Sequence, residues 1–80
     1  MNTEQEQVLR KICIKAKETR DNFVINCDVG VPLDKRNEIC RWLERNGYIS
    51  RYGVSGKSYV SCQVNAKAIE FFRGSQEEEL

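Results

Sequence analysis

A chain of 80 residues with 40% hydrophobic and 31% charged side chains is long enough for one domain but too short for a deep substrate cavity, and its composition excludes a disordered protein. No apolar run approaches the roughly 20 residues of a membrane span and the amino terminus does not resemble a signal peptide, so we expect a cytoplasmic protein without a membrane partner. The net charge is only +1, but residues 10–73 hold all thirteen bases and seven of the twelve acids, a net charge of +6 between acidic ends.

The first predicted element is an amphipathic helix over residues 4–19. Its apolar stripe recurs at helical spacing and consists of Val8, Leu9, Ile12, Cys13 and Ala16. Ile14 falls on the opposite side of the helix, where it either packs against a second layer such as the carboxy-terminal helix or forms a dimer contact. We expect the first of these arrangements.

A strand and a second helix follow. Residues 23–29 predict a strand through their β-branched content, with Phe23, Ile25 and Cys27 alternating inward. The second helix spans about residues 33–46: Pro32 suits its start, Asp34 can cap or favour its positive end, and Gly47 can adopt the left-handed conformation that stops it. Its inner face consists of Ile39, Cys40 and Leu43.

The last part of the chain predicts a β-hairpin and a short helix. Residues 48–52 and 58–64 flank a glycine-containing reversal at 53–57, and Asn65 is the expected cap of a helix that runs from Ala66 to about Arg73, before Gly74 ends it. The predicted fold is therefore α+β, in the order helix, strand, helix, β-hairpin, helix with a small antiparallel sheet. A single domain spans residues 1–80, with an ordered core at about 4–73 and an acidic tail at 75–80.

The cysteines are expected to be buried free thiols. They form no Cys-x-x-Cys pair, the chain has no histidine, and all four fall at interior positions of the predicted elements. They are Cys13, Cys27, Cys40 and Cys62. We expect no metal, no cofactor and no enzyme activity, because a paired-carboxylate motif is also absent and the glycines at 53–58 lack the spacing and the following helix of a phosphate loop.

Two short motifs flank the second helix: Gly30-Val31-Pro32 before it, and Leu43-Glu44-Arg45-Asn46-Gly47-Tyr48-Ile49 at its end. Together they resemble the turn, recognition helix and exit of winged-helix proteins, in which a late leucine anchors the helix, a glycine ends it and the next aliphatic residue starts the wing. Residues 64–68 are similarly placed to the step into a closing helix. The resemblance spans most of residues 8–73 and implies a reduced or atypical winged helix, because a strand stands where the family has the preceding helix.

The resemblance implies a DNA-binding regulatory domain whose second helix enters the major groove of double-stranded DNA. The candidate nucleic-acid contacts are Lys35, Arg41 and Arg45 on that helix, with Arg51 and Lys57 on the hairpin. The same charges are also typical of a solvated helix, and Glu38 and Glu44 would repel phosphate.

The alternative hypothesis is a protein-interaction or self-assembly module on the same scaffold. It rests on Ile14 and on Trp42, which projects to the border of the second helix's apolar stripe. Trp42 either packs its ring against a wing strand or serves as a binding hot spot for a protein partner or a second copy.

Overall fold

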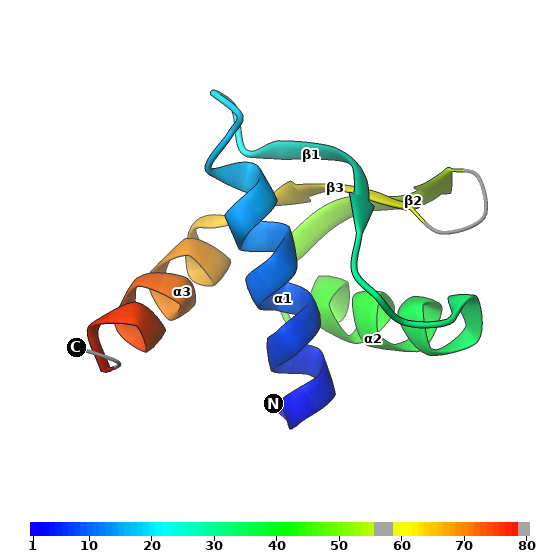
Figure 1. Ribbon diagram of the computed structural model, residues 1–80, viewed down its shortest axis with the longest axis horizontal. Coiled ribbons are helices and arrows are strands. Elements are labelled where there is room, and N and C mark those ends of the chain that lie inside the picture. Colours follow the sequence, from blue (N-terminus) through cyan, green and yellow to red (C-terminus); the bar gives the residue numbers. More distant parts are fainter. Residues whose placement is uncertain (56–58, 79–80) are drawn as a thin grey trace.

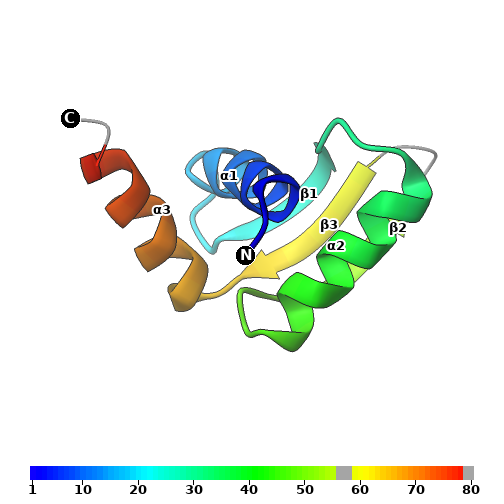
Figure 2. The same cartoon turned by 90° about the horizontal axis from the view of Figure 1, so that it is seen from below.

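Two helices pack on one face of a three-stranded antiparallel sheet, and the third packs against the first helix, in the computed structural model, which describes residues 1–55 and 59–78 (Figures 1 and 2). In chain order the elements are α1 (Thr3–Ala16), β1 (Phe23–Asp28), α2 (Leu33–Arg45), β2 (Ile49–Ser55), β3 (Tyr59–Val64) and α3 (Ala66–Glu78). The predicted α+β class and element order are therefore confirmed. Among the described residues, no helix has the length and apolar character that crossing a membrane requires.

Strand β3 is the centre of the sheet. The strand order is β1-β3-β2, and both pairs are antiparallel. Its side chains alternate between the two faces, as expected for a strand with one buried face. The inward residues, which lie beneath the helices, are Val60, Cys62 and Val64. The opposite face of the sheet has no described helix over it (Figure 1).

Strand β1 contains a bulge that the sequence pattern did not predict. Val24 pairs with Cys62 and Cys27 with Val60, so two residues of β1 oppose one residue of β3. Asn26 takes the left-handed conformation there (φ 55°), and its amide donates to the Ser61 hydroxyl at 3.2 Å. The extra residue shifts the alternation, so Val24 and Cys27 point inward. The predicted inward position of Ile25 is therefore wrong, because this side chain is 60% exposed.

Helix α1 matches the predicted first helix but is shorter. The Asn2 side chain accepts from the Gln5 amide at 2.8 Å, and the Gln5 side chain accepts from the Asn2 amide at 2.9 Å, which forms a capping box. The predicted end at residue 19 is wrong, because α1 ends at Ala16. In the turn that follows, the Thr19 hydroxyl donates to the Ala16 carbonyl at 2.8 Å. The predicted stripe from Val8 to Ala16 is buried throughout.

Helix α2 follows the prediction to within one residue. Asp34 lies in its first turn, but no side chain caps this end. At the other end Gly47 has a φ of 81°, the Tyr48 amide donates to the Leu43 carbonyl at 3.0 Å, and the Gly47 amide donates to the Glu44 carbonyl at 3.2 Å. These two bonds are those of a Schellman motif, which requires the left-handed residue that glycine supplies.

Helix α3 continues through Gly74 to Glu78, so the prediction that Gly74 ends it is wrong. One interior glycine costs a helix about 1 kcal/mol relative to alanine, which is not enough to terminate it. Asn65 precedes the helix as predicted, but its side chain accepts from the Ser50 hydroxyl at 3.2 Å and donates to the Gly47 carbonyl at 3.1 Å. It ties the start of α3 to β2 and to the end of α2.

All four cysteines are buried free thiols, as predicted. Burial raises the pKa of Cys13 to about 11 and the pKa of Cys40 and Cys62 to about 12, and it also raises the pKa of Cys27. The thiols therefore keep their protons at neutral pH and behave as small apolar side chains of the core.

Candidate nucleic-acid interface

The outer face of α2 is the surface on which the predicted nucleic-acid contacts depend. Its inner face is packed on the sheet and on α1 through Ile39, Cys40 and Leu43, as predicted. Exposed side chains occupy the opposite side of the helix: Asp34, Glu38, Arg41 and Arg45. These four residues define the outer face of α2.

Charge divides along this outer face. The two acids belong to the amino-terminal half of α2 and the two arginines to its carboxy-terminal half. This order matches the helix dipole, since acids are favoured near the amino end and bases near the carboxyl end. The basic surface that a phosphate backbone could contact is therefore confined to the last two turns of the helix.

Arg41 and Arg45 are exposed and lie four residues apart, so they project from neighbouring turns of the same side. Within the described part of the chain, neither guanidinium takes part in a hydrogen bond or an ion pair that would hold it in place. Their positive charge is available to a ligand.

Lys67 adds a third cation at this end of α2. Its Nζ donates to the Asn46 carbonyl at 2.6 Å and lies 4.5 Å from the centroid of the Tyr48 ring. These contacts fix its position at the carboxyl end of α2, although Lys67 belongs to the first turn of α3. The sequence analysis missed Lys67 because nothing in the local pattern indicates that the start of α3 meets the end of α2.

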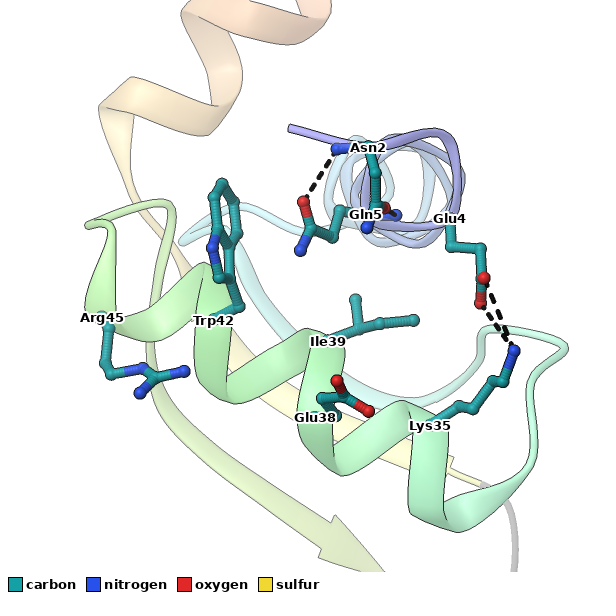
Figure 3. A pocket seen from close by; sticks show the side chains of 8 residues that line it. All are labelled: Asn2, Glu4, Gln5, Lys35, Glu38, Ile39, Trp42 and Arg45. Atoms are coloured by element: carbon teal, nitrogen blue, oxygen red, sulfur yellow. Dashed lines mark hydrogen bonds and ion pairs between the residues drawn. The ribbon is translucent and has the colours of Figure 1, made fainter.

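Lys35 lies on a different side of the helix from the two arginines. Its Nζ forms an ion pair with the Glu4 carboxylate at 3.4 Å, and both side chains remain more than half exposed. Figure 3 shows Lys35 reaching across from α2 to the first turn of α1. Lys35 therefore joins α2 to α1, and its charge is partly neutralised by Glu4.

Arg51 and Lys57 were the predicted contacts of the hairpin. Arg51 is exposed on β2, where it has a φ of 56° in a second bulge between Ser50 and Gly53. Lys57 lies outside the described residues. Of the four predicted basic residues that the structure describes, Arg41 and Arg45 lie four residues apart on α2, Lys35 and Arg45 line one groove, and Arg51 belongs to β2.

A groove of about 240 Å³ separates the start of α1 from α2 (Figure 3). Trp42 stands in this groove beside Asn2 and Gln5, and Arg45 also lines it, at the end nearer the carboxyl terminus of α2. The Trp42 ring stacks on Tyr48, with 6.1 Å between centroids and 17° between planes. Trp42 thus packs within the protein, on the residue before β2, and remains half-buried.

Ile14 does not pack against α3. Its side chain is 55% exposed and borders a hollow between α1 and β1, so the expected contact with the carboxy-terminal helix is wrong. The buried residues of α3 are Ala68 and Phe72, and Ile69 and Phe71 pack partly buried against the same core.

Arg36 is a buried charged residue of α2 for which the sequence pattern made no prediction. It counts toward the +6 charge of residues 10–73, yet it is only 3% exposed. Its Nη2 donates to the Val31 carbonyl at 2.7 Å, whereas Nε and Nη1 find no partner among the described residues. The spacing to Cys40 and Leu43 was a usable signal, because positions four and seven residues apart share a helix face.

Strand β2 is fastened to α2 beside the outer face. The Tyr52 hydroxyl donates to Asn37 Oδ1, and the Tyr52 amide donates to Glu44 Oε2 at 3.1 Å. Burial raises the pKa of Tyr52, and the charge of Arg41 partly opposes this rise. Glu44 is therefore engaged by the backbone of β2.

Comparison with known proteins does not add to this geometry. The chain matches no family model, no curated protein and no solved structure.

Proposed function

We propose that the chain is a small winged-helix-like domain that binds double-stranded DNA through the carboxy-terminal half of the outer face of α2. The observation that carries this proposal is the pair of exposed, unengaged guanidinium groups of Arg41 and Arg45 on one helix side. Arginine is the side chain best suited to phosphate oxygens and to the acceptor edge of guanine, because its donors form a rigid fork.

The arrangement around α2 supports the winged-helix comparison in three places. Leu43 is fully buried late in the helix, Gly47 ends it in a left-handed conformation, and Ile49 begins the hairpin strand β2. These are the positions at which the resemblance places the anchor, the stop and the start of the wing. Under this proposal Arg51 contacts the phosphate backbone beside the helix.

The element before α2 departs from that comparison. β1 ends at Asp28 and α2 begins at Leu33, so a short connection replaces the helix that precedes the recognition helix in the family. The described contacts that position α2 come from Arg36, from Tyr52 of β2 and from the Lys35–Glu4 pair. We infer that the hairpin and α1 orient α2 in place of a helix-turn-helix unit.

Fluorescence anisotropy with a mixed-sequence duplex oligonucleotide, titrated at low and near-physiological salt, tests the proposal. We expect binding that weakens steeply with salt, because each phosphate contact releases counterions and contributes about −0.9 to the slope of log K against log salt. The Arg41→Glu/Arg45→Glu variant should lose this binding.

The matched control is Arg20→Glu/Arg73→Glu, which changes the net charge by the same amount at exposed positions away from α2. It should retain most of the affinity. Absence of binding by the unmodified protein at low salt, or an equal loss in both double variants, would contradict a DNA interface on α2.

A further inference from the structure

A second surface lies on the other side of the molecule, where α1 borders β1. The two most exposed of the large apolar residues are Ile25 of β1, at 60%, and Ile14 of α1, at 55%. Ile14 lines a shallow hollow of about 350 Å³ between α1 and β1, and Asn26, next to Ile25, lines it too. Ile14 is the exposed apolar residue of this hollow, and it is surrounded there by two bases and two acids: Lys11, Lys15, Glu18 and Asp28.

The side of α1 that faces this hollow has an ordered set of charges. Lys11, Ile14 and Glu18 line it, and their spacing of three and four residues places them in one stripe along the helix and the turn that follows. Lys15 also lines the hollow, where it pairs with Glu18 of the same chain. The stripe therefore presents a base, an apolar residue and an acid in sequence. Read from the opposite end, it presents the complementary order.

A stripe of this kind is complementary to itself. If a second copy lies antiparallel across a two-fold axis near Ile14, Lys11 faces Glu18 of the second copy and Glu18 faces its Lys11, with the two isoleucines between them. A two-fold contact requires this self-complementarity, because each residue meets its counterpart in reverse. We propose that this α1–β1 face is the docking surface of a second copy of the chain, which forms a symmetric dimer.

The charges on this face favour a second copy over other partners. The hollow is lined by two bases, Lys11 and Lys15, and by two acids, Glu18 and Asp28, so it has no excess positive charge that would attract DNA. A uniformly acidic or basic protein segment would match one end of the stripe and be repelled at the other. The contacts that these charges make within the chain are weak: Lys15 pairs with Glu18 at 3.4 Å on the surface, and Lys11 Nζ lies 3.5 Å from the Val29 carbonyl.

Side chains rather than a continued sheet form this contact. β1 has no strand beside its outer edge among the described residues, but its bulge interrupts the regular row of hydrogen-bonding groups that strand addition requires. The inference goes beyond DNA binding, since it uses neither arginine of the outer face.

The test is a charge exchange followed by sedimentation equilibrium from about 10 μM to about 1 mM protein. Lys11→Glu alone should be monomeric, because it places two acids opposite each other, and Glu18→Lys alone should be monomeric, because it places two bases opposite each other. An equimolar mixture of the two variants should form a heterodimer, since both cross-pairs are then complementary. Misfolding of either variant could not produce that recovery.

Ile14→Arg should also be monomeric at every concentration, whereas the matched control Leu33→Arg, at an exposed apolar residue on α2, should dimerise like the unmodified protein. A monomeric unmodified protein at about 1 mM, a dimer that persists in both single charge variants, or a mixture that stays monomeric would each overturn the proposal. Duplex binding by the Ile14→Arg variant, measured separately, would show that the two surfaces act independently.

Discussion

Both edge strands of the sheet contain a β-bulge, but the side chain that it redirects is bonded to a helix in one strand and exposed in the other. β1 and β2 each have a bulge against β3, and each bulge holds a residue with a positive φ, Asn26 at 55° and Arg51 at 56°. In β2 the shift turns Tyr52 toward α2, where it bonds Asn37 and Glu44. In β1 the shift leaves Ile25 on the surface.

The difference lies in what faces each bulge. α2 runs close to β2, so a side chain redirected there finds apolar and polar partners. At β1 the neighbouring element is α1, whose nearby side chain Ile14 is itself exposed. Both edge strands pack against a helix, but the side chain beside the β2 bulge bonds to that helix whereas Ile25 at the β1 bulge stays on the surface. In this sense β2 is the closed edge and β1 is the open edge.

The largest expected effect concerns Cys62 of the strand that both edges share. Burial raises the pKa of Cys62 and of Cys40 to about 12, so above pH 9 the folded state holds protons that the unfolded chain releases. The free energy of unfolding should therefore keep its full value below pH 9 and fall by on the order of several kcal/mol as the pH rises toward 12. Urea unfolding at pH 7, 9 and 10.5 measures the decline.

Cys62→Ala is the control for that titration. It should be less stable at neutral pH because it leaves a cavity, but its stability should decline less between pH 9 and 10.5. If the free energy of unfolding of Cys62→Ala declined with pH as steeply as that of the unmodified protein, groups other than Cys62 would be responsible for the loss of stability at alkaline pH.

The buried faces of the helices could be predicted from the sequence, whereas the bulges could not. The stripe from Val8 to Ala16 follows the helical repeat, and Gly47 follows the last turn of α2, so local pattern was sufficient for both. The inward residues of β1 depend on which residues of β3 they oppose, and the Ser61 hydroxyl that bonds the Asn26 amide is 35 residues away in the chain. No local alternation contains that information.

The candidate site was predictable to a similar extent. Arg41 and Arg45 were correctly placed on the solvent side of α2 by helical spacing. Local spacing could not predict two other contacts, the pairing of Lys35 with Glu4 and the approach of Lys67 to Asn46, because each joins residues from different helices or loops. Burial of Arg36 was not predicted, although its spacing to Cys40 and Leu43 places it on the inner face.

The contrast between the closed and the open edge can be measured directly by truncating one side chain at each. Tyr52→Ala should lower the free energy of unfolding by about 2–3 kcal/mol, because a half-buried ring and its bonds to α2 are lost. Ile25→Ala should change it by less than about 0.5 kcal/mol, since the side chain is mostly exposed. Urea unfolding at low protein concentration, where the proposed dimer is dissociated, gives both values.

Tyr52→Phe separates the two contributions at β2. It keeps the ring and removes the hydroxyl that donates to Asn37, so a loss of about 1 kcal/mol is expected. Equal losses for Tyr52→Ala and Ile25→Ala would contradict the distinction between the edges.

The smallest effect concerns the two bulge residues with a positive φ, Asn26 and Arg51. For most side chains the left-handed conformation costs roughly 1–2 kcal/mol, whereas asparagine tolerates it through local hydrogen bonds. Glycine removes that strain but loses about 0.5–1 kcal/mol through the greater freedom of the unfolded chain. Arg51→Gly should therefore stabilise the fold by about 0.5 kcal/mol, and Asn26→Gly should leave it unchanged or slightly weaker. The shift in the urea midpoint at constant slope measures both changes, and a larger gain at Asn26 than at Arg51 would mean that the strain lies at the open edge instead.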